Sequence, residues 1–89
     1  MAFDSFASKD FWDLYAELPE EVQQLADKQY ARFRQNPSHP SLALKQTGAV
    51  WSVRVGNSYR AVAYRQGKEF FWFWIGSHET YNKLLKRVK

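Results

Sequence analysis

The stretch Val50-Trp-Ser-Val-Arg-Val55, followed by the turn dipeptide Gly56-Asn57 and by Ser58-Tyr-Arg-Ala-Val-Ala-Tyr-Arg65, decides the fold. Apolar and polar side chains alternate on both sides of the dipeptide. Such alternation around Gly-Asn is typical of two antiparallel strands joined by a tight turn. The sequence therefore predicts a β-hairpin at the centre of the chain.

The register of this hairpin decides where its arginines lie. A three-residue turn (56–58) places Val55 opposite Tyr59 and Arg54 opposite Arg60, whereas a two-residue turn puts Arg54 on the apolar face. Burying an unpaired arginine is costly, so we expect the three-residue turn, with both arginines on one open sheet face. The core face then carries Trp51, Val53, Val55, Tyr59, Ala61 and Ala63.

The segments around the hairpin predict further elements. A third strand, Glu69–Ile75, is apolar on both faces, which suits a central or covered strand, and a terminal helix is expected over Thr80–Lys89. Apolar side chains at helical spacing predict two helices upstream, one capped by Ser8 and ending near Glu17, the other running from Pro19 to Asn36. A short extended edge strand is expected around Phe3–Phe6.

The expected fold class is thus α+β, as a single domain over residues 1–89. An N-terminal helical hairpin packs on a three- to four-stranded antiparallel sheet, and a short C-terminal helix follows. Four Trp, five Tyr and seven Phe supply a core despite the short chain.

Composition excludes several kinds of chemistry. The absence of cysteine removes disulfides, thiolate nucleophiles and cysteine-based zinc sites. The longest apolar run, Phe70–Ile75, is far short of the roughly 20 residues that a membrane span requires. No secretory signal begins the sequence, so we expect a cytoplasmic protein that does not bind membranes.

Charge is unevenly distributed along the chain. Residues 1–40 carry four basic and seven acidic side chains, a net charge of −3. Residues 41–89 carry nine basic side chains against Glu69 and Glu79, a net charge of +7. A basic half rich in aromatics is the composition expected for contact with nucleic acid, although ordinary solvated charge explains it equally well.

Arg54, Arg60 and His78 are candidates for binding a phosphate and transferring a proton. Like charges directly opposite on a sheet repel, so the arginine pair favours an anion such as phosphate between its members. His78 directly follows the third strand, with Tyr81 three residues later. Histidine side chains exchange protons near neutral pH, and arginine stabilises the charge of a pentacoordinate phosphate. These groups would suffice for RNA cleavage by a neighbouring 2′-hydroxyl.

The sequence resembles the RelE/ParE superfamily of toxins from type II toxin–antitoxin modules. The resemblance runs from about Phe3 to Leu85. It rests on the order of elements and on short motifs, which are Asn36-Pro37-Ser-His-Pro-Ser-Leu42, Lys45, Trp51-Ser-Val-Arg54-Val, Tyr59-Arg60-Ala and Trp74-Ile-Gly-Ser-His78-Glu-Thr-Tyr81.

This resemblance implies a toxin that cuts messenger RNA on the ribosome without a metal or other cofactor. It also implies silencing by a cognate antitoxin. Arg54, Arg60 and His78 match the catalytic positions of the RelE type, and Tyr81 matches a terminal aromatic. Ser52 departs from that pattern, because a RelE-type member has lysine there. Whether Lys45 substitutes for it is open.

Alternatives remain open at this point. The resemblance also permits a ParE-like inhibitor of DNA gyrase without catalysis, or an inactive homologue that retains antitoxin binding. Arg54 and Arg60 could instead form salt bridges with the acidic helices, and Tyr81 could be a core residue. His39 is expected to serve loop architecture. Phe70–Ile75 is expected to be a core strand, and an exposed Trp72 or Trp74 that acts as a stacking platform is the alternative. Further RNA contacts are expected from Lys45, Arg65, Lys83, Lys86 and Arg87.

Overall fold

The central hairpin is present in the computed structural model, which describes residues 4–88. Strands β3 (Val50–Val55) and β4 (Tyr59–Gln66) are antiparallel, with Val55 opposite Tyr59 and Arg54 opposite Arg60. The turn thus has three residues, and Gly56 adopts a φ of 62°, a left-handed conformation that glycine reaches without steric cost. The predicted register is confirmed.

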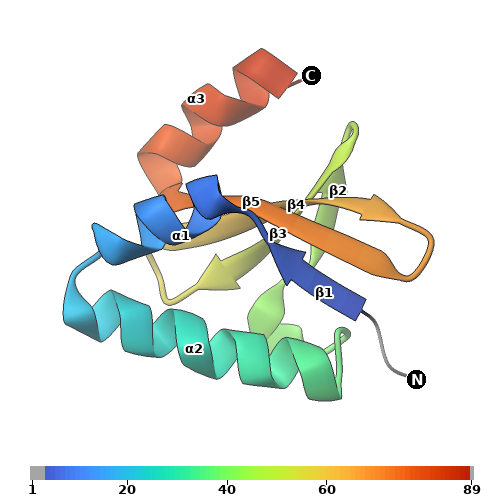
Figure 1. The fold of residues 1–89 in the computed structure, drawn as a ribbon, viewed down its shortest axis with the longest axis horizontal. Coiled ribbons are helices and arrows are strands. Elements are labelled where there is room, and N and C mark those ends of the chain that lie inside the picture. The colour runs from blue at the N-terminus through green and yellow to red at the C-terminus, as the bar shows by residue number, and fades with distance from the viewer. Residues whose placement is uncertain (1–3, 89) are drawn as a thin grey trace.

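The sheet has five strands in the order β1-β5-β4-β3-β2 (Figure 1). Strand β5 (Glu69–Ser77) lies between β4 and the edge strand β1 (Asp4–Ala7), which runs parallel to it, and β2 (Lys45–Thr47) forms the other edge. The prediction of three or four antiparallel strands is therefore wrong in strand number and in the direction of β1. Strand β2 is too short to show alternation, and the partner of β1 lies at the far end of the chain.

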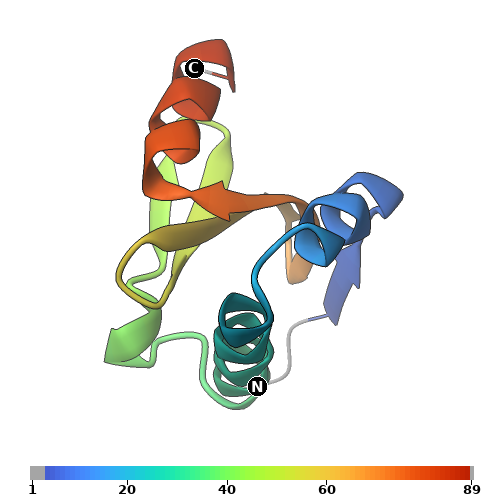
Figure 2. The same cartoon turned by 90° about the vertical axis from the view of Figure 1, so that its left-hand side faces the viewer.

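Helices α1 (Lys9–Ala16) and α2 (Glu20–Gln35) form the predicted helical hairpin on one side of the sheet (Figures 1 and 2). Ser8 caps α1 as expected, since its Oγ accepts a hydrogen bond from the backbone N–H of Phe11 at 3.2 Å. A 3₁₀ turn, η1 (Pro40–Leu42), follows α2 and leads into β2.

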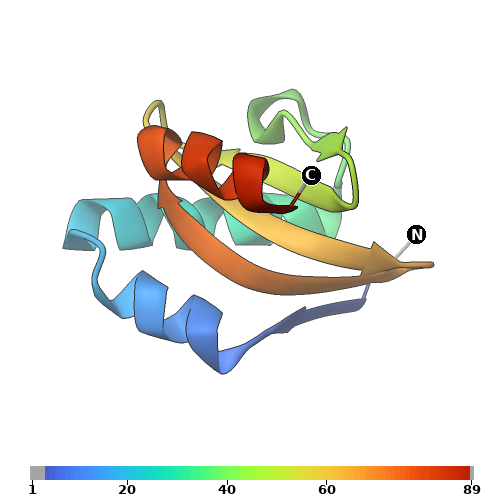
Figure 3. The same cartoon turned by 90° about the horizontal axis from the view of Figure 1, so that it is seen from above.

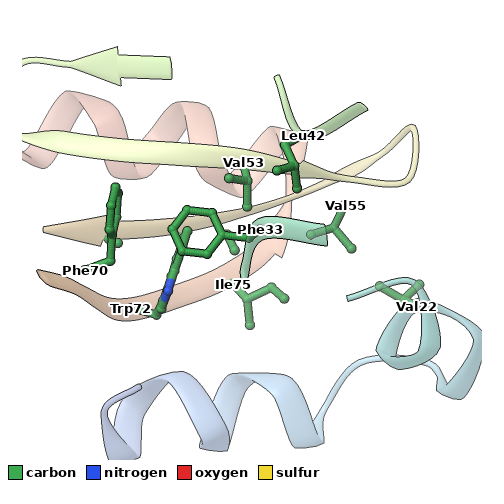
Figure 4. Close-up of a cluster of buried hydrophobic side chains, with 10 residues drawn as sticks. Val22, Phe33, Leu42, Val53, Val55, Phe70, Trp72 and Ile75 are labelled. Atoms are coloured by element: carbon green, nitrogen blue, oxygen red, sulfur yellow. The ribbon is translucent and has the colours of Figure 1, made fainter. Parts of the chain in front are cut away.

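The main core lies between this helical hairpin and the sheet (Figure 4). Its sheet side includes the predicted core residues Val53, Val55, Ala61 and Ala63, while Trp51 and Tyr59 pack partly buried against it. The aromatic centre of the core is Phe33 from α2, edge-on to Phe70 and Trp72 at 4.9 and 5.3 Å between ring centroids. The remaining buried members are Val22, Leu42 and Ile75.

The opposite sheet face, which we expected to be open, is covered in part by helix α3 (His78–Val88) (Figure 3). A second buried cluster joins Val50 and Val62 of the sheet to Tyr81 of α3. Helix α3 begins at His78, two residues before the predicted start. Ser77 supports the early start, because its Oγ accepts from the backbone N–H of Thr80 at 3.3 Å.

Phe70–Ile75 is part of a core strand, as expected, and the described residues of this strand do not form the alternative, an exposed tryptophan platform. Trp72 is buried in the main core, where its indole N–H donates to Ser5 Oγ at 2.8 Å. Trp74 is half-buried, with its ring centroid 6.4 Å from that of Tyr81. Trp72 therefore packs on the side of the helical hairpin and Trp74 on the side of α3, so both tryptophans serve packing.

Candidate functional site

Two arginines lie side by side on the sheet face that carries α3. Arg54 of β3 is directly opposite Arg60 of β4, and Arg60 is in turn opposite Gly76 of β5. Side chains at directly opposite positions have Cβ atoms about 4.5–5.5 Å apart. Among the side chains that the structure describes, neither arginine has a carboxylate partner. The alternative of salt bridges to the acidic helices is therefore wrong for the described residues.

Arg60 is held by the ring of Tyr81. Its Cζ lies 5.3 Å from the ring centroid, a distance at which the cation and the aromatic face attract each other. The guanidinium is half-buried, and its Nε and Nη1 are enclosed without a hydrogen-bond partner. Enclosed donors without partners cost free energy, so the guanidinium of Arg60 is held here by its contact with the ring and not by hydrogen bonds from these two nitrogens.

Tyr81 itself is a core residue. Only 4% of its surface is exposed, and its hydroxyl lies 3.2 Å from the Oγ of Ser52, which is 1% exposed. The hydroxyl therefore points into the sheet. What Tyr81 offers the site is its ring, on which Arg60 stacks. Of the two sequence-based interpretations of Tyr81, its position favours packing.

His78 lies at the junction of β5 and α3. Its backbone N–H donates to the carbonyl of Ser58 at 2.7 Å, which ties the start of α3 to the turn of the central hairpin. Its imidazole is exposed and meets the Tyr81 ring edge-on, with centroids 5.9 Å apart. Arg60 and His78 thus contact the same aromatic ring, and Arg54 is the cross-strand neighbour of Arg60.

Asn82 is a neighbour of His78 that the sequence interpretation missed. Its Nδ2 lies 3.4 Å from His78 Nδ1, a long contact. An amide nitrogen can only donate, so this contact favours the tautomer that carries the ring proton on Nε2, the nitrogen away from Asn82. Residues four apart on a helix are neighbours, so a predicted helix that begins at His78 in place of Thr80 would have indicated the contact between His78 and Asn82.

Lys45 occupies the position beside Ser52. The two residues are directly opposite each other in the β2–β3 pair, so Lys45 lies on the same sheet face as Arg54 and Arg60. The buried Ser52 is thus flanked by an exposed lysine one strand away. This arrangement makes Lys45 a candidate for the basic group that the RelE-type pattern has at position 52.

The other predicted RNA contacts do not all converge on this face. Arg65 lies on the opposite face, with its Cζ 4.9 Å from the ring centroid of Trp51 and 5.1 Å from that of Phe70. Its Nε donates to the carbonyl of Gly67 at 2.8 Å. Lys83, Lys86 and Arg87 are exposed along α3. The structure therefore separates Arg65 from the arginine pair.

His39 stabilises the loop after α2, as expected. His39 Nδ1 accepts from the backbone N–H of Ser41 at 3.1 Å and holds the η1 turn. In the region the structure describes, no three His, Cys, Asp or Glu side chains gather in a way that could hold a metal ion. None of the helices among residues 4–88 has the length and apolar character needed to cross a membrane.

Comparison with known proteins assigns the class of this α+β domain. A family model for the ParE-like toxin domain matches residues 20–83, which is most of the chain. The chain therefore belongs to the ParE-like toxin domain family, within the RelE/ParE superfamily of toxins from toxin–antitoxin modules. No curated protein matches the sequence.

Solved structures of the same fold have low sequence identity to this chain. A double mutant of the E. coli toxin RelE in the free state is 18% identical, with a TM-score of 0.68 and full coverage of both chains. An archaeal RelE–RelB complex from Pyrococcus horikoshii is 14% identical, with a TM-score of 0.67 over 86% of this chain and 96% of that one. A YoeB/ParE toxin from Agrobacterium tumefaciens is 14% identical, with a TM-score of 0.65 over 84% and 98%.

Proposed function

We propose that this protein is the toxin of a type II toxin–antitoxin module and cleaves messenger RNA on the ribosome without a metal. The observation that carries the proposal is that Arg60 and His78 meet on the ring of Tyr81, with Arg54 directly opposite Arg60 on the neighbouring strand. Two guanidinium groups without carboxylate partners can bind a phosphate, and a histidine beside them can transfer a proton.

The reaction that these groups support is an internal transesterification. The 2′-oxygen of one nucleotide forms a bond to the adjacent phosphorus, and the bond from phosphorus to the 5′-oxygen of the next nucleotide breaks. The 2′-hydroxyl releases its proton to solvent, and His78 in its protonated form donates a proton from Nε2 to the departing 5′-oxygen. Arg54 and Arg60 stabilise the added negative charge on the phosphate oxygens in the transition state.

The position of the site supports a substrate that is held by a larger partner. The three groups lie on an outer sheet face beside α3, and two of them, Arg54 and His78, are exposed. The apolar hollow lined by α1, α2 and the core strands is on the other side of the sheet. An exposed site orients RNA poorly by itself, so we infer that the ribosome presents the message.

A cognate antitoxin is the second partner that we propose. Solved structures of similar fold include complexes of RelE with RelB. Residues 41–89 of this chain carry a net charge of +7. An acidic segment that crosses the arginine pair would neutralise Arg54 and Arg60 and block access to phosphate.

The matching family model favours one alternative, which is inhibition of DNA gyrase without catalysis, because the model describes a ParE-like toxin domain. In this alternative the basic face binds a protein or DNA surface and His78 has no chemical role. The two functions differ in the process that stops, which is translation in one case and DNA supercoiling in the other.

A cell-free assay tests the proposal. The purified toxin is added to a coupled translation system, and messenger RNA is mapped for new 5′ ends. We expect the wild type to stop translation and cleave the message, and His78→Ala and Arg60→Ala to lose roughly 100-fold or more of the cleavage rate. Arg34→Ala is the matched control, because Arg34 is exposed on α2, on the other side of the sheet.

Two results would contradict the proposal. Intact messenger RNA together with inhibited gyrase supercoiling would establish the alternative. Intact RNA and unaffected supercoiling, with antitoxin binding retained, would identify an inactive homologue.

A further inference from the structure

A buried amide connects helix α2 to the arginine pair. Gln29 is 8% exposed and forms hydrogen bonds through both the nitrogen and the oxygen of its side-chain amide. Its Nε2 donates to the backbone carbonyl of Arg54 at 2.7 Å and to that of Ser41 at 3.1 Å. Its Oε1 accepts from Arg32 Nη1 at 3.1 Å and from Ser41 Oγ at 3.4 Å. Each of the two amide protons thus has an acceptor.

The neighbours of Gln29 determine which way its amide points. A guanidinium can only donate, so the atom facing Arg32 is Oε1, and Nε2 faces the two carbonyls. Arg32 also donates to Ser41 Oγ at 3.1 Å, and Ser41 is held in turn by His39. The Arg32–Gln29–Ser41 cluster is therefore a connected network in which the orientation of one amide is set from several sides.

The carbonyl that Gln29 holds lies on a part of β3 without an outer strand. Strand β2 pairs with residues 50–52 of β3 and ends there. Beyond Ser52 the outer edge of β3 lacks a strand partner, and Arg54 is the place where Gln29 supplies one. Gln29 thus gives the carbonyl of Arg54 a hydrogen-bond donor on the edge of β3 where no strand supplies one.

The two arginines of the site differ in how they are supported. The guanidinium of Arg60 stacks on Tyr81. The side chain of Arg54 is exposed and has no hydrogen bond, ion pair or ring contact within residues 4–88. The position of Arg54 is therefore set by its backbone, which pairs with β4 on one edge and is held by Gln29 on the other.

We propose that Gln29 is a positioning residue for Arg54, acting across the sheet from the helical side. The inference rests on the proposed function, because it assigns Arg54 to phosphate binding. It adds that the Arg32–Gln29–Ser41 network determines whether Arg54 meets the phosphate together with Arg60. A displacement of about 1 Å at such a group is enough to cost up to roughly 100-fold in rate.

The test compares Gln29→Met with Gln24→Met. Methionine matches glutamine in length without the hydrogen bonds, and Gln24 is an exposed residue of the same helix. Amide ¹⁵N relaxation reports the order of Arg54 and Arg60 separately. We expect Gln29→Met to lower the order parameter of Arg54 from about 0.85 toward 0.6, with Arg60 unchanged. Gln29→Asn, one methylene shorter, is a second variant in case the methionine variant does not fold.

Cleavage rates complete the test through a double-mutant cycle with Arg54→Ala. We expect Gln29→Met to lower the rate at least tenfold in the presence of Arg54 and less than twofold in its absence, because a positioning residue acts only through its partner. Equal losses in both backgrounds, or equal loosening of Arg54 and Arg60, would show a merely structural role and overturn the inference. If Arg54→Ala leaves cleavage unchanged, the proposed role of Arg54 fails, while the relaxation data still decide whether Gln29 anchors its backbone.

Discussion

The buried contact between Ser52 and Tyr81 predicts a particular pattern of stabilities. The two oxygens are 3.2 Å apart, and the side chains are 1% and 4% exposed. The variants are Ser52→Ala, Tyr81→Phe and the double variant. Each single change leaves one hydroxyl buried without a partner, whereas the double change removes both.

The magnitude follows from the cost of an unsatisfied buried group. Each single variant is expected to lose about 1–2 kcal/mol of unfolding free energy, and the double variant no more than either single one. The coupling between the two positions is then about 1 kcal/mol or more. For a domain of this size, each 1 kcal/mol corresponds to a shift of roughly 4–8 °C in melting temperature.

Urea unfolding of the four proteins measures the cycle. Ser58→Ala and Tyr64→Phe are matched controls, because both side chains are exposed, and each should change stability by less than about 0.5 kcal/mol. Additive single effects, or a Tyr81→Phe variant as stable as the wild type, would refute the hydrogen bond as a contributor to stability.

Two substitutions of Tyr81, to phenylalanine and to leucine, separate its two interpretations, which are packing and a part in the chemistry. Phenylalanine keeps the ring on which Arg60 stacks and which His78 contacts, whereas leucine removes it. We therefore expect RNA cleavage to survive Tyr81→Phe and to fall in Tyr81→Leu. Loss of cleavage in a stable Tyr81→Phe protein would instead place the hydroxyl in the chemistry.

Three further predictions concern the core, pH and the basic face. Phe33→Ala empties the aromatic centre of the core and should cost about 3–5 kcal/mol in denaturant unfolding, enough to unfold a marginally stable domain. Burial and the nearby Asp27 carboxylate, which accepts the phenol hydrogen bond at 2.8 Å, raise the pKa of Tyr15. This contribution to stability is complete below about pH 10 and is lost as the pH rises through the folded-state pKa, so thermal melts of Tyr15→Phe should show a weaker decline at high pH. Lys45→Ala should weaken RNA binding and reduce the slope of affinity against salt by about one phosphate contact in a titration series, and an unchanged slope would exclude Lys45 from the RNA interface.

Local patterns were sufficient for much of the fold and for the arginine pair. Alternation around Gly56 and the cost of burying Arg54 predicted both the hairpin and its register. The cap at Ser8 and the apolar spacing that follows it predicted the helical hairpin. These inferences succeed because turn geometry, capping and side-chain periodicity depend on residues that are close in sequence.

The features that failed or were missed depend on contacts between distant segments. The parallel pairing of β1 with β5 and the packing of α3 on the sheet join residues far apart in the chain. No local pattern shows that Tyr81 is buried under Arg60 or that Arg65 lies on the opposite face. The hydrogen bond from the amide of Gln29 to the carbonyl of Arg54 also has no local sequence pattern that predicts it.

The sequence by itself thus determined the elements, the hairpin register and the residue types available for a phosphate site. Only the tertiary structure decided that α3 closes over the sheet beside that site, so that one aromatic ring contacts Arg60 and His78 while helix α2 anchors Arg54. The physical reason is that side-chain burial and hydrogen-bond partners are set by packing between layers, and such packing leaves no periodic trace in the chain.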